Sequence, residues 1–243
     1  PESVTLAAPV PERPVAGLAA DGDGTPLLLA WQAGRFAWRT AGGKERTLDV
    51  PPLPPAREIA GPWTIRFDPA AGGPGDVTFP QLEDWAQRAE DGIRFYSGTA
   101  LYQTTFKFDN ESSPAARWLL DLGRVEVMAE VTLNGKDLGI AWKPPYRIDV
   151  SHALRAGDNK LELKVVNLWI NRQIGDEFLP EDSDRNPNGT LRSWPDWVGQ
   201  GKPSPAGRFT LTSWRLWKKT DPLRPSGLLG PVRLCPVVAM PLR

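Results

Sequence analysis

The stretch AGDNKLELKVV, residues 156–166, alternates apolar and polar side chains in its second half and predicts a β-strand. Leu161, Leu163 and Val165 share one face of this strand, because successive strand residues point to opposite sides. Gly157, Asp158 and Asn159 come just before the alternation and predict a turn. A strand with one apolar face is typical of an antiparallel sandwich.

Segments of the same kind lie on both sides of this strand. The dipeptide Asn134-Gly135 predicts a tight hairpin turn between two of them. The predicted strands cover residues 61–67, 99–108, 116–123, 126–135, 136–145, 146–154, 207–219 and 228–242, and residues 80–90 form a short helix with Glu83 and Asp84 near its start. The sequence therefore predicts an all-β protein, an antiparallel β-sandwich.

The N-terminal quarter of the chain has a different pattern. Residues 1–24 are rich in Pro, Ala and Gly and predict a lead-in without regular structure, while residues 26–50 predict two or three strands of an incomplete β unit. Residues 51–56, PPLPPA, form an extended connector because consecutive prolines hold the polyproline II conformation. We expect one division of the chain, into residues 1–56 and a sandwich of residues 57–243.

One long segment interrupts the series of strands. Between residues 176 and 205 the periodicity disappears and polar, Pro and Gly residues dominate. A stretch of about 30 residues without regular structure is rare in a compact domain and is often functional. This irregular loop is therefore the first place to look for a site.

Composition excludes several classes of function. Lys plus Arg equals Asp plus Glu, 29 against 29, so nothing indicates a nucleic-acid or membrane surface. The chain has one Cys and one His, which excludes disulfides within the chain and metal sites built from Cys or His clusters. Eleven tryptophans are many for 243 residues, and a surplus of Trp suits a carbohydrate-binding surface as well as a packed core.

Six ordered blocks carry a resemblance to a known family. They are GPWTIRF (61–67), LEDWAQ (82–87), FYSGTALYQTTF (95–106), residues 120–150, residues 157–177 and PSGLLGPVRL (225–234). Together they resemble the C-terminal galactose-binding-like β-sandwich of glycoside hydrolase family 106, the α-L-rhamnosidases. More distantly they are similar to the sugar-binding jelly roll of glycoside hydrolase family 2.

The resemblance implies an accessory module. In that family the catalytic carboxylates belong to an upstream (β/α)₈ barrel, and no repeated strand-helix pattern hosts one here. The start at Pro1 without Met fits a chain with residues removed upstream. The expected partners are carbohydrate and that barrel, with no nucleic acid and no membrane. No cofactor is expected. The expected location is periplasmic or extracellular.

The stretch NLWINRQIGDE, residues 167–177, is the first candidate site. In one interpretation its polar groups bind sugar hydroxyls while a tryptophan stacks on the ring; the residues are Asn167, Trp169, Asn171, Arg172, Asp176 and Glu177. In the other, Trp169 and Ile174 pack inward while Asn171 and Asp176 satisfy buried backbone groups. Both interpretations are open from the sequence.

Two further aromatic pairs are candidates for sugar stacking. Trp142 and Tyr146 flank Pro144-Pro145, which would hold them as a rigid platform or, equally, place them over the core. Trp194 and Trp197 lie in the polar loop, where no strand period assigns them to a core. The second pair therefore predicts an exposed stacking surface or a contact with another domain.

The same loop contains a weak calcium pattern. Asp184, Asn186 and Asn188 have the spacing of the first ligands of an EF-hand loop, and Gly189 follows. The twelfth position, where that loop needs a bidentate Glu, is Pro195. A structural calcium site is thus one interpretation, and a plain surface loop is the other.

No pair of acids has the spacing of a glycosidase. Asp176 and Glu177 are adjacent and would point apart on an extended chain, whereas glycoside hydrolysis needs two carboxylates across one bond. We expect a non-catalytic accessory module, with two alternatives: a purely structural interdomain module, or a self-contained glycosidase.

Overall fold

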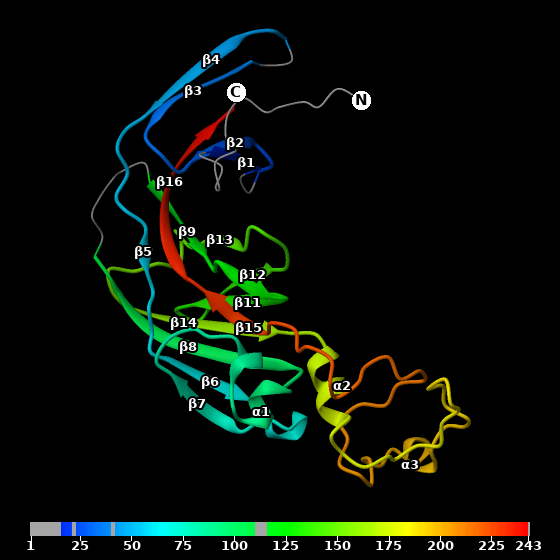
Figure 1. Cartoon of the computed structure of the whole chain (residues 1–243). Helices are drawn as coiled ribbons and strands as arrows, with labels where there is room; N and C mark the ends of the chain where they lie inside the picture. The colour runs from blue at the N-terminus through cyan, green and yellow to red at the C-terminus, as the bar shows by residue number, and fades with distance from the viewer. Residues whose placement is uncertain (1–15, 21–22, 40–41, 110–115, 243) are drawn as a thin grey trace.

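The computed structural model describes residues 16–20, 23–39, 42–109 and 116–242. Its larger elements are two antiparallel sheets that face each other in the middle of the molecule (Figure 1). The first sheet has the order β12-β11-β14-β8-β6-β7. Its strands are β6 (Trp63–Phe67), β7 (Gly75–Phe79), β8 (Thr99–Phe108), β11 (Met128–Leu133), β12 (Lys136–Ala141) and β14 (Gly157–Val166).

The second sheet has the order β1-β2-β16-β9-β13, with β5 paired to β16. Its strands are β1 (Ala16–Ala20), β2 (Pro26–Ala30), β5 (Arg57–Glu58), β9 (Ala116–Asp121), β13 (Arg147–Asp149) and β16 (Arg233–Pro241). Two small ladders add β10 (Arg124–Glu126) with β15 (Gly227–Gly230), and β3 (Gly34–Arg39) with β4 (Glu45–Val50).

Helices are few and short. They are η1 (Pro69–Ala71), η2 (Trp85–Gln87), α1 (Asp91–Arg94), α2 (Ile170–Asp176) and α3 (Asp196–Gly199). The short helix expected in residues 80–90 is thus a single 3₁₀ turn, which Asp84 caps by accepting from Ala86 N at 2.9 Å. In the described part of the chain no helix is long and apolar enough to cross a membrane.

The core lies between the two sheets. Leu161, Leu163 and Val165 of β14 are fully buried, as their alternation predicted. They join Val131 and its neighbours from β11 and, from the facing sheet, Leu120 of β9 in one apolar cluster. The antiparallel β-sandwich predicted from the sequence is confirmed, because alternation along each strand supplies the apolar face that each sheet buries.

The hairpin at Asn134-Gly135 is also confirmed. Both residues have positive φ angles, 54° and 77°, as a tight two-residue turn between β11 and β12 requires. Asn134 accepts from Lys160 N with Oδ1 and donates to Asn159 Oδ1 with Nδ2, which ties the turn to β14. These side-chain hydrogen bonds therefore help to fix the register of β11 against β14 at this end of the sheet.

The N-terminal segments join the second sheet. β2 pairs with β16, β1 pairs with β2, and the β3–β4 hairpin extends beyond them at one end of the molecule (Figure 1). β1 lies in the segment expected to be a lead-in without regular structure, and residues 1–15 and 21–22 of that segment lie outside the described residues. The division at residue 56 stays a prediction.

The expected strand at residues 207–219 is wrong. Apart from an isolated bridge between Trp214 and Thr190, this segment has no ladder partner. It belongs to a lobe, residues 177–222, that projects from the sandwich beyond α2 at the end opposite the β3–β4 hairpin (Figure 1). The lobe contains most of the irregular loop predicted from the sequence.

Burial of the tyrosines predicts a test of the core at alkaline pH. Burial raises the pKa of all three, Tyr96, Tyr102 and Tyr146, above the ordinary value of about 10. The folded state therefore holds these protons more tightly than the unfolded state, and stability falls as pH rises above about 10. We expect spectrophotometric titration to show tyrosinate at lower pH in guanidinium than in the native protein.

The fully buried Tyr102 should dominate this effect. In a Tyr102→Phe variant the free energy of unfolding should decline less steeply with pH above about 10, whatever its value at neutral pH. Native tyrosines that titrate together near pH 10, as in the unfolded chain, would contradict the prediction.

Candidate functional site

The end of β14 is fixed by an asparagine. Asn167, the residue after β14, accepts from Gly98 N at 3.0 Å and donates to Tyr96 O at 2.8 Å. Its side chain is buried, so the amide replaces ladder bonds for the neighbouring loop where the strand stops. Its polar atoms are directed into the protein.

Asn171, in the first turn of α2, holds the segment that leads into β15. It donates to Arg224 O at 2.7 Å and to Ser226 Oγ at 3.0 Å, and it accepts from Arg224 N at 2.8 Å. The side chain is 1% exposed. For both asparagines the contacts favour the structural interpretation over direct contact with sugar.

Asp176, the last residue of α2, anchors the returning part of the lobe. Its Oδ2 accepts from Phe209 N at 3.0 Å, Thr210 N at 2.7 Å and Thr210 Oγ1 at 2.7 Å. Because Asp176 is buried, these bonds satisfy two backbone donors that would otherwise lack a partner. The carboxylate therefore has a structural role.

Arg172 lies one turn before Asp176 on the same face of α2. Its guanidinium lies 4.7 Å from the ring centre of Phe209, and its Nη1 is 3.9 Å from Asp176 Oδ1. Burial lowers the pKa of Arg172, while the charges of Asp176 and Asp91 raise it in part. A buried arginine, an acid and an aromatic ring thus join α2 to the lobe.

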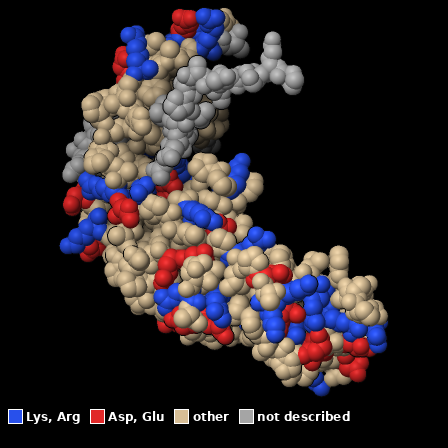
Figure 2. Space-filling view, viewed as in Figure 1, with Lys and Arg blue, Asp and Glu red and all other residues tan. Residues whose placement is uncertain are grey.

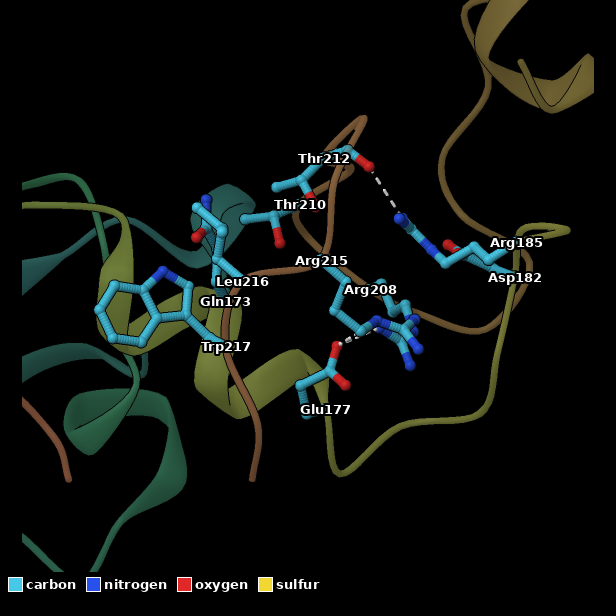
Figure 3. Close-up of a pocket in the computed structure, with 10 residues that line it drawn as sticks. All are labelled: Gln173, Glu177, Asp182, Arg185, Arg208, Thr210, Thr212, Arg215, Leu216 and Trp217. Carbon is cyan, nitrogen blue, oxygen red and sulfur yellow. Dashed lines mark hydrogen bonds and ion pairs between the residues drawn. The ribbon is translucent and has the colours of Figure 1, made fainter. Parts of the chain in front are cut away.

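The interior of the lobe is built from arginines and carboxylates (Figure 3). Glu177 Oε1 lies 3.1 Å from Arg208 Nη1 and 3.1 Å from Arg215 Nε. Arg185 donates to Gly189 O and Thr212 O, each at 2.9 Å, and burial lowers the pKa of its guanidinium. Figure 2 shows basic and acidic side chains gathered on this lobe.

This polar interior leaves apolar side chains outside. Of the ten large apolar side chains that are exposed among the described residues, seven lie between residues 168 and 216. They are Leu168, Trp169, Phe178, Trp194, Phe209, Trp214 and Leu216. Large exposed apolar side chains concentrated in one stretch of the chain indicate where a ligand or another domain would contact it.

Trp194 and Trp197 border a groove of about 640 Å³, which we call the Trp194 groove. Trp194 is 66% exposed, while the Trp197 indole donates to Asp182 O at 3.2 Å and is fixed by it. The lining residues are Ala70, Trp194, Trp197, Val198, Lys202, Pro203, Ser204, Gly207, Arg208, Phe209, Thr210 and Leu211. Its volume is in the range of ligand-binding clefts.

The predicted residues do not form one site. Trp169 is 58% exposed at the start of α2, whereas Trp142 and Tyr146 come from the connection between β12 and β13. Lys143 Nζ lies 5.1 Å from the Trp142 ring centre, and Tyr146 packs partly against the core. The structure thus brings together the Asn167–Glu177 segment and the Trp194–Trp197 pair through the lobe, without the platform at Trp142.

The expected calcium ligands already have protein partners. Asn188 Oδ1 accepts from Thr190 N and Oγ1, Asn186 Oδ1 accepts from Arg192 Nε at 3.3 Å, and Asp184 Oδ2 lies 3.5 Å from Arg192 Nη1. The residues that the structure describes contain no group of three or more His, Cys, Asp and Glu side chains arranged for a metal ion. Calcium binding at this loop stays a prediction.

Sequence reasoning missed Phe209, Lys202 and Arg208 as groove residues. Phe209 and Leu211 alternate with polar residues in residues 207–219, which imitates a strand. One feature of the sequence could have indicated these residues: the segment 207–219 comes directly after the irregular loop of residues 176–205.

Comparison with known proteins agrees with the fold. Residues 83–197, which include β8, β14 and α2, match the family described as glycosyl hydrolase 2 galactose-binding domain-like. The chain contains a galactose-binding-like domain. A protein of Formosa agariphila, provisionally named a beta-glucuronidase, is 39% identical over 213 residues, covering 87% of this chain and 18% of that protein.

The galactose-binding-like domain also has a solved structural relative. The rhamnosidase from Novosphingobium sp. PP1Y is similar with a TM-score of 0.63 and 26% identity, over 91% of this chain and 23% of that one. The chain therefore spans about a fifth of the length of these relatives. Membership of glycoside hydrolase family 106 in particular stays a prediction.

Proposed function

We propose that this chain is a non-catalytic accessory module of an α-L-rhamnosidase-like glycoside hydrolase. Its lobe docks beside the upstream catalytic barrel, helps to shape the substrate cleft, and contacts rhamnose-containing plant glycan outside the cytoplasm, in the periplasm or beyond the cell. The observation that carries this proposal is the apolar surface at residues 168–216. The rhamnosidase and glucuronidase names of the similar proteins support the enzyme class.

The carboxylates of the site support a role without bond cleavage. Asp176 accepts hydrogen bonds from backbone N–H groups, and Glu177 forms ion pairs with two arginines. A glycosidase needs one carboxylic acid that gives a proton and a second carboxylate free to attack or to activate water. Both carboxylates already have partners that hold the lobe in place. We therefore expect no turnover of aryl rhamnosides or aryl glucuronides by the chain.

Calorimetric titration tests the carbohydrate contact. We expect weak, saturable binding of rhamnogalacturonan oligosaccharides, since stacking must offset the cost of immobilising a hydrated sugar. Trp169→Ala should weaken binding several-fold if the start of α2 takes part, because each stacked ring contributes about 1 kcal/mol. The control is Trp38→Ala, on the β3–β4 hairpin at the opposite end of the molecule.

A purely structural module is the second candidate. It is favoured by the internal hydrogen bonds of Asn167 and Asn171, which leave these amides no role in sugar contact. Absence of heat with rhamnose, galactose and every oligosaccharide, together with binding to a separately expressed catalytic domain, would replace the first proposal by this one.

A further inference from the structure

The Trp194 groove combines aromatic walls with an uneven distribution of charge. Lys202 and Arg208 are its charged lining residues, and none of the lining residues is acidic. The neighbouring carboxylates Asp176, Glu177 and Asp182 are bonded to the lining residues Thr210, Arg208 and Ser204. A ligand that fits it has an apolar face and a negative charge.

Two of the aromatic walls, Phe209 and Trp197, are fixed by contacts inside the protein. Phe209 packs between the Arg172 guanidinium, 4.7 Å from its ring centre, and Gly72, where an added Cβ would lie 2.6 Å from the ring. Its backbone is held by Asp176. Trp194 stands 66% exposed at the rim. An exposed indole above a wall that is already held suits stacking, because its face is open to a ligand and only a two-torsion side chain is ordered on binding.

The other polar lining groups are directed into the protein. Thr210 Oγ1 donates to Asp176, and Ser204 Oγ donates to Asp182 at 2.6 Å. Arg208 donates to Glu177, Pro180 O and Leu179 O, so its charge is already balanced. Lys202 is exposed, and its backbone is held by a 2.8 Å bond from its N to Trp197 O. The positive charge that a ligand would meet is therefore that of Lys202.

We propose that the Trp194 groove binds an anionic sugar residue, one that carries a carboxylate or a sulfate ester. The sugar ring stacks on Trp194, and the anion lies at the Lys202 ammonium. This inference rests on the proposed carbohydrate contact and gives it a place and a substrate class. An ammonium binds carboxylate and sulfate through the same charge-assisted hydrogen bonds. Titration with one ligand of each kind therefore decides which of the two anions the groove binds.

The test titrates the 243-residue chain with four ligands: oligogalacturonate, its neutral methyl ester, a sulfated galactan oligosaccharide and a neutral rhamnose-containing oligosaccharide. We expect at least one anionic ligand to bind roughly two- to fivefold more tightly than the methyl ester, which is the effect of an exposed ion pair. Binding should weaken with added salt because the site is exposed. The stronger of the two anionic ligands identifies carboxylate or sulfate.

Three variants locate the binding. Lys202→Gln should remove the preference for the anionic ligand, and Trp194→Ala should reduce binding of both the anionic and the neutral forms. The matched control is Lys219→Gln, which removes the same charge from another exposed lysine of the lobe and should leave binding unchanged. Circular dichroism checks that each variant is folded, as expected for exposed side chains.

The outcomes separate this inference from the proposed function. Equal binding of oligogalacturonate, its ester and the sulfated ligand, or equal losses in Lys202→Gln and Lys219→Gln, overturns the anionic groove and leaves the carbohydrate module standing. Binding that survives Trp194→Ala but not Trp169→Ala also overturns it, by placing the sugar at α2. No binding of any carbohydrate overturns both.

Discussion

An Asp176→Ala variant should release the lobe from α2 while the sandwich stays folded. The substitution leaves the N–H groups of Phe209 and Thr210 without their acceptor and removes the carboxylate paired with the buried Arg172. Removing one partner of a buried charge pair costs about 3–5 kcal/mol. Few apolar contacts remain to oppose this loss, because the lobe interior is polar.

Hydrogen exchange is the measurement that resolves this effect. Backbone amides 209 and 210 should lose protection by several orders of magnitude, whereas the amides of β14 and β8 should change little. The control is Asp184→Ala, whose carboxylate is exposed and pairs with Arg192 at 3.5 Å. Unchanged exchange at residues 209 and 210, or uniform loss of protection across the sandwich, would show that Asp176 does not anchor the lobe.

The sandwich was predictable because its strands follow a simple rule. Each strand buries one face, so Leu161, Leu163 and Val165 reveal their orientation by alternation alone. The hairpin at Asn134-Gly135 was predictable for a similar reason, since a two-residue turn demands positive φ angles that few residue types accept.

Helix α2 was not predictable by the same means. Its buried face consists largely of Asn171, Arg172 and Asp176, so the apolar period of about 3.6 residues that marks a helix is absent. Its N-cap residue, Trp169, makes no side-chain capping bond. Asn171 and Asp176 bond to backbone groups and Ile174 is buried, as one of the two interpretations expected, but Trp169 is exposed instead of packed inward.

The lobe shows why the rest of the site was out of reach. Asp176 and Phe209 are separated by 32 residues, and their contact depends on an arginine and carboxylate interior that leaves no periodic trace in the sequence. Residues 207–219 alternate like a strand, but they find no neighbouring strand to pair with. Alternation of apolar and polar residues indicates a segment with one apolar face. The segment becomes part of a sheet only where a neighbouring strand forms hydrogen bonds with it.

Trp85 connects the core to the candidate site. It is fully buried in an aromatic cluster, with ring centres 5.1 Å from Phe67 and 5.8 Å from Tyr96. Its Nε1 donates to Tyr102 Oη at 2.6 Å, and its backbone N donates to Ser226 O at 3.1 Å. Ser226 Oγ in turn accepts from Asn171 on α2. The cluster thus supports the segment on which α2 rests.

A Trp85→Ala variant should lower the free energy of unfolding by about 3–5 kcal/mol, because the removed indole leaves a cavity that the surrounding sheets cannot close. For a domain of this size that corresponds to a fall in Tm of roughly 6–20 °C. Denaturant titration and thermal unfolding measure it, with Trp169→Ala as the control, an exposed tryptophan whose loss should cost less than about 0.5 kcal/mol. Similar stabilities for the two variants would contradict a core organised around Trp85. A large loss in Trp85→Ala alone would show that Trp85, in the block LEDWAQ, serves packing of the core on which α2 rests.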